Sequence, residues 1–133
     1  MAYEESLRSI TLNADATLAT RTGVPGMPGS ADPNGGKQYH FVKVTGAHQV
    51  GLADADDVIV GVMQNKPQIT GEAATVAIRG VSKVVCDVAI TAGDVIKVSA
   101  DGQAAKTGSG PSVGVALSTT TVAGQLVSVL LTL

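Results

Sequence analysis

Val60-Gly61-Val62 recurs as Val113-Gly114-Val115 at an offset of 53 residues, and each copy is followed by a second matched stretch. Ten residues after each middle glycine another glycine appears, and residues 72–78 and 125–131 then run in the same register. Each stretch places apolar residues at every second position, the period of a strand with one buried face. The repeat therefore predicts two equivalent strand–turn–strand units that face each other and close one core by pseudo-symmetry. The two inward sets are Ala74, Val76, Ile78 and Val127, Val129, Leu131.

The sequence around these units continues the β pattern. Residues 42–45 (VKVT) echo residues 96–99 (IKVS) at an offset of 54, and Asp101-Gly102 predicts a two-residue hairpin turn. Short strands separated by turns, without helical periodicity, predict an all-β fold: a small β-sandwich or barrel with an internal strand–turn–strand repeat. The expected strands are 39–45, 48–53, 58–63, 73–79, 81–88, 94–99, 103–106, 113–117 and 126–133.

The first 37 residues differ from the rest of the chain. Residues 9–18 alternate polar and apolar side chains without exception, which favours a strand over the helix that the spacing of Leu7, Ile10, Ala14 and Leu18 also permits. Residues 22–37 contain three prolines and five glycines, which are typical of a loop or connector. We therefore expect an extended N-terminal arm and Gly/Pro-rich linker at 1–37 and a β domain at 38–133.

Composition excludes several classes of function. The net charge of −2 and the 2% content of aromatic residues offer no surface for nucleic acid. No apolar run reaches the roughly 18 residues of a membrane span. The acidic N-terminus does not resemble a signal peptide, and the single cysteine fits synthesis in a reducing cytoplasm.

The sequence contains no constellation of catalytic, cofactor-binding or metal-binding residues. His40 and His48 lack the spacing of a zinc site, and Cys86 shares a predicted strand face with valines, which indicates a buried structural thiol. Residues 54–57 (DADD) lack the glycine and glutamate of a calcium loop and are expected to form a solvated acidic turn. We expect a protein that is not an enzyme and needs no cofactor or metal.

Several stretches, which together cover nearly the whole chain, resemble the tailed-phage capsid decoration (cement) proteins. The most specific is VGVMQNKP at residues 60–67, followed by RGVS at 79–82; residues 3–12 and 37–44 are also similar. The resemblance implies a structural virion protein, made in the host cytoplasm, that binds the outer surface of a phage capsid and stabilises it. It also implies contact with the major capsid protein, a homotrimer, and no catalytic residues.

The arm supplies the candidate contacts for this role. Its apolar face needs a cover, which its own core, a sister subunit or the capsid would provide, and linked weak contacts gain strength through effective concentration. The candidate interaction residues are Tyr3, Arg8, Ile10, Leu12, Leu18 and Arg21.

Two other functions fit parts of the sequence. Residues 90–96 (ITAGDVI) resemble a turn of lipoyl-like carrier domains, but the nearby Asp101-Gly102 hairpin has no lysine at its tip to carry a cofactor. A receptor- or glycan-binding β domain of a phage head or fibre is the other alternative. Sugars usually stack on aromatic side chains, and this chain has only Tyr3, Tyr39 and Phe41.

Overall fold

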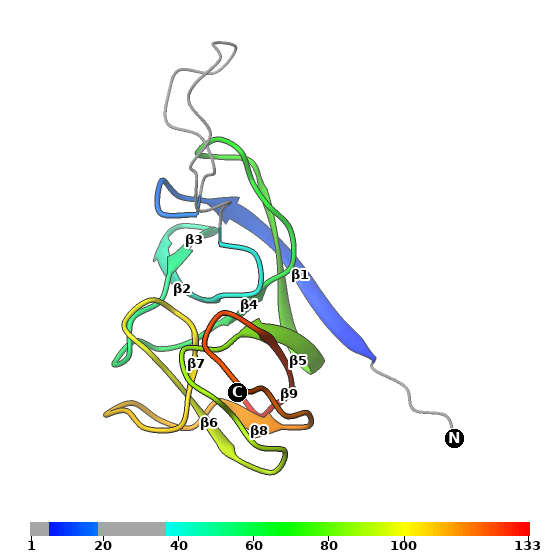
Figure 1. Ribbon diagram of the computed structural model, residues 1–133. Helices are drawn as coiled ribbons and strands as arrows, with labels where there is room; N and C mark the ends of the chain where they lie inside the picture. The colour runs from blue at the N-terminus through cyan, green and yellow to red at the C-terminus, as the bar shows by residue number, and fades with distance from the viewer. Residues whose placement is uncertain (1–5, 19–36) are drawn as a thin grey trace.

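The structure, a computed structural model, describes residues 6–18 and 37–133, and in these residues the regular secondary structure consists of β-strands joined by turns and loops. No helix capable of crossing a membrane occurs in those residues. The prediction of an all-β fold is confirmed (Figure 1). The described residues form nine strands: β1 (Leu7–Ala14), β2 (Phe41–Gly46), β3 (Gln49–Leu52), β4 (Gly61–Met63), β5 (Ala73–Val85), β6 (Val95–Val98), β7 (Ala104–Ala105), β8 (Gly114–Ala116) and β9 (Leu126–Leu131).

The strands of the described residues form two closed circuits of paired strands, each a small barrel, and both barrels include β5. In one circuit, neighbouring strands follow the order β1, β3, β2, β4 and β5, and β5 pairs again with β1. In the other, β5 is followed by β9, β8, β6 and β7, and a bridge between Ala104 and Cys86 returns the chain to the end of β5. Figure 1 shows β2–β4 above β6–β9, with β5 reaching both groups. We call β1–β4 with the first half of β5 repeat 1, and the second half of β5 with β6–β9 repeat 2.

The predicted repeat is confirmed at the level of individual residue pairs. Val62 pairs with Ala77 in repeat 1 and Val115 pairs with Leu130 in repeat 2, an offset of 53 on both strands. The offset of 54 also holds, because the registers of β2 with β3 and β4 recur in those of β6 with β7 and β8. The structure adds a relation that the sequence analysis did not predict: β1 is equivalent to the second half of β5 at an offset of 72.

Each repeat encloses its own buried residues, which corrects the prediction of one core between two facing units. The cluster in repeat 1 comprises Ala14, Leu18, Val42, Val50, Met63, Ala74 and Val76. All seven equivalents are buried in the cluster of repeat 2: Cys86, Ile90, Ile96, Ala104, Ala116, Val127 and Val129. That second cluster also takes in residues from the outer face of repeat 1, namely Phe41, Ala53, Val62 and Ala77. The two repeats are therefore joined by an apolar interface.

β1 belongs to the folded domain, so the predicted boundary between an arm and a domain at residue 37 is corrected. The strand expected over 9–18 ends at Ala14 and leads into a turn in which the Leu18 N–H donates to the Asp15 carbonyl (3.2 Å). The Thr17 hydroxyl accepts the Leu52 N–H (2.8 Å), which ties this turn to β3. Leu18 itself is fully buried in repeat 1.

Residues 19–36, which the structure does not describe, are an insertion relative to repeat 2. Leu18 corresponds to Ile90 at an offset of 72, and Lys37 corresponds to Thr91 at an offset of 54. The carbonyls of Lys37 and Thr91 each accept the N–H three residues later, at 3.2 and 2.9 Å. The offsets differ by 18 residues, the length of the segment 19–36. Repeat 2 therefore closes the same barrel with a direct peptide bond at this junction.

Two local predictions are also corrected. The strands expected at 73–79 and 81–88 are one strand, β5, which passes from repeat 1 to repeat 2 at Gly80. Gly80 has φ +98°, a left-handed conformation that favours glycine, and a β-carbon there would collide with the Ser6 carbonyl. The Asp101-Gly102 hairpin has a three-residue loop, because the Gly102 N–H donates to the Ser99 carbonyl (3.1 Å) and Gly102 has φ +69°.

Candidate interaction surface

The predicted interaction residues lie in different environments. Arg8 and Ile10 are exposed on β1, with 39% of Ile10 accessible, while Leu12 is partly buried against the core of repeat 1. The prediction of Leu18 as an interaction residue is wrong, because its side chain is enclosed within repeat 1. The remaining two predicted residues lie outside the described part of the chain: Tyr3 and Arg21.

One edge of β1 has no partner strand over most of its length among the described residues. It pairs with β5 along most of its length, whereas β3 reaches only its last two residues, and no other described strand pairs with it. The Asn13 N–H donates to the His48 carbonyl (2.8 Å), on the side away from β5. Since successive N–H groups of a strand alternate between its two edges, the N–H of Thr11 also points away from β5. This edge offers backbone donors and acceptors to an incoming strand.

A positive spot lies beside that edge. Arg8 is directly opposite Arg79 in the antiparallel pair of β1 and β5, and both residues are exposed. Like charges at directly opposite positions destabilise a sheet. Among the described residues the ion pair is that of Lys43 and Asp57, so neither arginine has an ionic partner there. A carboxylate on a binding partner would reduce the repulsion between the two arginines.

The residues considered for chemistry have structural contacts. The Cys86 thiol is buried and donates to the Val122 carbonyl (3.3 Å), close to the Thr120 hydroxyl (3.4 Å). His48 adopts φ +54° in the turn between β2 and β3. In residues 6–18 and 37–133 no three His, Cys, Asp or Glu side chains gather in a way that would hold a metal ion.

The acidic turn at 54–57 is held by its own contacts. The Asp57 carboxylate accepts the Asp54 N–H (2.7 Å) and forms the ion pair with Lys43 (2.8 Å). The hydrogen bond from Lys43 lowers the pKa of Asp57, and the bond from Asp54 acts in the same direction. The Asp56 carboxylate accepts a hydrogen bond from the Ser109 hydroxyl, which joins the turn to repeat 2.

His40 lies at the junction between the repeats. Its Nδ1 is 3.0 Å from the Gln38 carbonyl, and its Nε2 is 3.5 Å from the Gln103 side-chain nitrogen. Burial disfavours the charged imidazolium and lowers the pKa of His40 below its ordinary value of 6.5. The neutral ring is therefore part of the contact that holds the repeats together.

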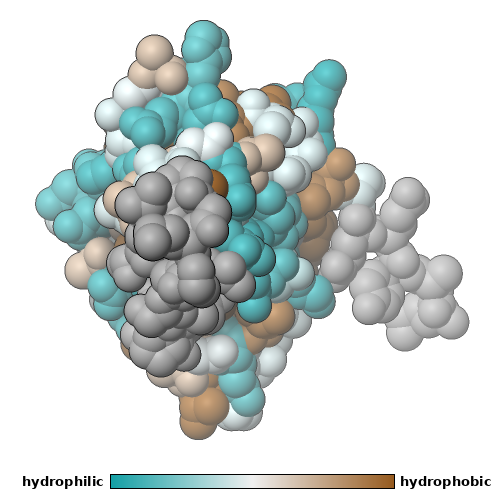
Figure 2. Space-filling model, turned by 90° about the horizontal axis from the view of Figure 1, so that it is seen from above, coloured by the Kyte–Doolittle hydropathy of each residue, from teal (hydrophilic) through white to brown (hydrophobic). Residues whose placement is uncertain are grey.

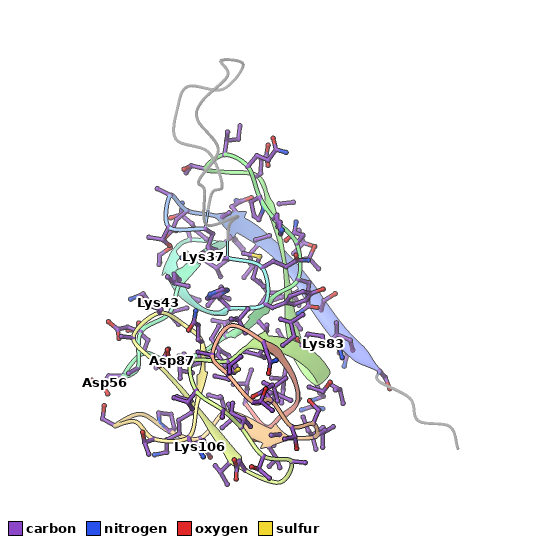
Figure 3. The ribbon with its side chains drawn as sticks, viewed as in Figure 1. Lys37, Lys43, Asp56, Lys83, Asp87 and Lys106 are labelled. Atoms are coloured by element: carbon purple, nitrogen blue, oxygen red, sulfur yellow. The ribbon has the colours of Figure 1, made fainter. Side chains whose placement is uncertain are left out.

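Sequence reasoning missed a second surface, which we call the repeat 2 face. Its outward side chains lie on adjacent strands, and in the case of Leu117 directly after β8, around Lys83, whose ammonium donates to the Ser128 hydroxyl (3.1 Å). Figure 3 shows Lys83 on the side of the ribbon away from Lys43 and Asp56. A comparison of the repeats position by position would have identified it. The repeat 2 face comprises Val81, Val85, Val95, Val115, Leu117, Leu126 and Leu130.

The fold is similar to that of a solved phage structure. No protein-family model matches the sequence, and no curated protein matches it. Among solved structures, the chain resembles the N base of head fiber gp8.5 in bacteriophage phi29, with a TM-score of 0.62 and 18% sequence identity. The alignment covers 96% of this chain and 95% of that chain. The likeness therefore extends over the complete two-repeat fold.

Proposed function

We propose that this protein is a non-enzymatic structural protein of a phage head, which binds the outer surface of the capsid through the major capsid protein and stabilises it. The observation that carries the proposal is the similarity of the whole fold to the N base of a phage head fiber protein. The resemblance of residues 60–67 and 79–82 to capsid decoration proteins supports the same role. We further propose that the protein acts as a homotrimer, because several linked weak contacts would hold neighbouring capsid subunits together.

β1 is the capsid-binding element in this proposal. Its free edge would add to a strand of the capsid protein, since unpaired backbone groups at a sheet edge bind extended segments. Arg8 and Arg79 beside it would contact an acidic side chain of the partner. The exposed part of Ile10 would be covered by the added strand.

Binding of purified protein to undecorated capsids tests the proposal. Proline at position 11 removes the outward N–H of Thr11 but no bond to β5, so Thr11→Pro should keep the fold and weaken capsid binding by at least tenfold. Thr11→Val keeps that N–H and serves as the matched control. Arg8→Glu should weaken binding most at low salt, because the contact is electrostatic. Failure of the wild-type protein to bind capsids would refute the proposed function, and equal binding by Thr11→Pro would refute the role of the edge.

A receptor- or glycan-binding domain of a phage head or fibre is the second candidate function. The observation in its favour is that the structural neighbour is a head fiber protein. Binding of the protein to host cells or to a glycan array, without binding to capsids, would favour this function over capsid binding.

A further inference from the structure

Because the two repeats have the same fold, the residues at equivalent surface positions can be compared directly. At four equivalent outward positions of the same fold, repeat 1 has small or polar residues and repeat 2 has larger apolar residues. Leu126 is 46% exposed and Leu117 is 50% exposed, although both positions accept a smaller or polar residue in repeat 1. The equivalent pairs, with repeat 2 first, are Val81 and Ser9, Val85 and Asn13, Leu117 and Gln64, and Leu126 and Ala73.

The fold itself therefore does not require apolar residues at these positions. Repeat 1 closes the same barrel, in the same register, with Ser9 and Asn13 on its outer face. Contiguous exposed apolar surface is uncommon on proteins that act alone and marks contact sites. Figure 2, which views the molecule from above, shows apolar surface on that side as separate patches among polar residues. The repeat 2 face extends over the adjacent strands β5, β9, β8 and β6, with Lys83 and Ser128 between its apolar side chains.

One row of side chains in the repeat 2 face has an equivalent row in repeat 1, and the structure shows what packs on that equivalent row. In repeat 1, three side chains in a row across β2, β4 and β5 are fully buried because repeat 2 packs on them: Phe41, Val62 and Ala77. The equivalent row in repeat 2 crosses β6, β8 and β9 and remains accessible, with Val95 at 53% and Leu130 at 41%: Val95, Val115 and Leu130. In repeat 1, this row is therefore covered by repeat 2. In repeat 2, no described part of the chain covers the equivalent row.

We propose that a second copy of this chain covers the repeat 2 face. The internal interface shows that this region of the fold accepts a barrel of the same chain. The residues that define the face are apolar; Lys83, which lies among them, donates to the Ser128 hydroxyl, and its ammonium would have to keep contact with water or meet an anionic group in the interface. This assignment deepens the proposed function, because it names the surface through which the capsid-bound protein self-associates and leaves the free edge of β1 for the capsid.

The oligomeric state in solution tests the assignment. The variant Val81→Ser, Val85→Asn, Leu117→Gln and Leu126→Ala gives each position the residue that repeat 1 carries there. The control variant, Val44→Ser with Val58→Ser, removes two exposed valines outside the face that are 60% and 86% accessible. Mass would be measured by sedimentation and native mass spectrometry up to about 100 μM, a concentration at which a Kd of about 1 μM gives mostly oligomer. Circular dichroism and thermal melting would report folding.

The wild-type protein and the control variant should form the same oligomer, and the fourfold variant should be folded and monomeric, with self-association weakened on the order of 100-fold. A wild-type monomer at every concentration would overturn the assignment, as would a folded fourfold variant that remains oligomeric. If the fourfold variant fails to fold, the oligomeric state of the single variant Leu117→Gln is measured instead. Weakened self-association of that variant would support the assignment, and unchanged self-association would overturn it. A monomer that loses capsid binding on substitution of this face would assign the face to the capsid protein and also overturn self-association.

The capsid-binding assay separates this inference from the proposed function. Loss of the oligomer without loss of intrinsic capsid affinity supports the assignment. An oligomer built on this face that binds no capsid would leave the assignment standing and refute the proposed function. A monomeric wild-type protein that binds capsids would refute the assignment of this face to self-association and leave the proposed function standing.

Discussion

Excision of residues 19–36, with Leu18 joined directly to Lys37, should leave the fold intact. The equivalent junction in repeat 2 is the peptide bond between Ile90 and Thr91, and the turns that follow the two junctions are equivalent. Leu18 and Ile90 are both fully buried on one side of the junction. The shortened chain would therefore have a local geometry that the protein already uses once.

The effect on stability follows from the cost of closing a loop. The entropic cost rises as (3/2)RT ln n, which for the 18 inserted residues is about 2.6 kcal/mol relative to a direct connection. Excision should therefore keep or raise the free energy of unfolding, by up to about 2.6 kcal/mol, and raise the melting temperature on the order of 5–10 °C. Chemical denaturation and calorimetry would measure both quantities.

The reciprocal insertion is the matched control. Placing the sequence of residues 19–36 between Ile90 and Thr91 should lower the free energy of unfolding by about the same amount while leaving the fold intact. Deletion of residues 6–18 should instead unfold repeat 1, because β1 closes its barrel and Leu18 fills its core. An excised protein that loses its cooperative transition would refute the equivalence of the two junctions.

Three further changes test the core, the close packing of strands and the junction between repeats. Leu18→Ala should reduce the free energy of unfolding by about 2–5 kcal/mol in denaturation, because its side chain is fully buried, and a loss below about 1 kcal/mol would contradict that burial. Gly114→Ala should lower the melting temperature, since a β-carbon there would collide with the Leu130 carbonyl; an unchanged melting curve would contradict this close approach. Stability should fall as the pH drops below 6.5, because the unfolded chain takes up a proton that the lowered pKa of His40 keeps off the folded protein. His40→Gln should flatten that dependence, and an unchanged pH profile would show that other groups cause it.

The repeat was predictable because the residues that mark it serve the same local purpose twice. Gly61 and Gly114 lie where strands approach closely, and Gly71 and Gly124 have φ near +90° in equivalent turns. Those requirements fix both the residue type and its spacing. The similarity between the two stretches of sequence therefore indicated that the two units have equivalent structures.

The closure of two barrels was not predictable from the same evidence. β1 and the second half of β5 have the same role, but Ile10 stands where repeat 2 has Ser82, and 72 rather than 53 residues separate them. The inserted segment 19–36 hides the relation, since it separates Leu18 from Lys37 in sequence. The same segment made residues 1–37 look like an arm, although Leu18 is a core residue. Whether a residue on the outer face of a barrel is buried depends on contacts between the repeats, and a local sequence pattern carries no information about those contacts.

The repeats differ in sequence at outward positions where the common fold sets few constraints. All seven core positions of repeat 1 remain buried in repeat 2, while four outward positions are small or polar in repeat 1 and apolar in repeat 2, and repeat 1 has 18 additional residues at one junction. A core residue cannot change freely, because each barrel must be filled. An outward residue such as Asn13 or its equivalent Val85 is free to change, because neither is needed to close the barrel. On this reasoning the two candidate contacts of the molecule are separate surfaces: the free edge of β1 in repeat 1, and the apolar outer face of repeat 2.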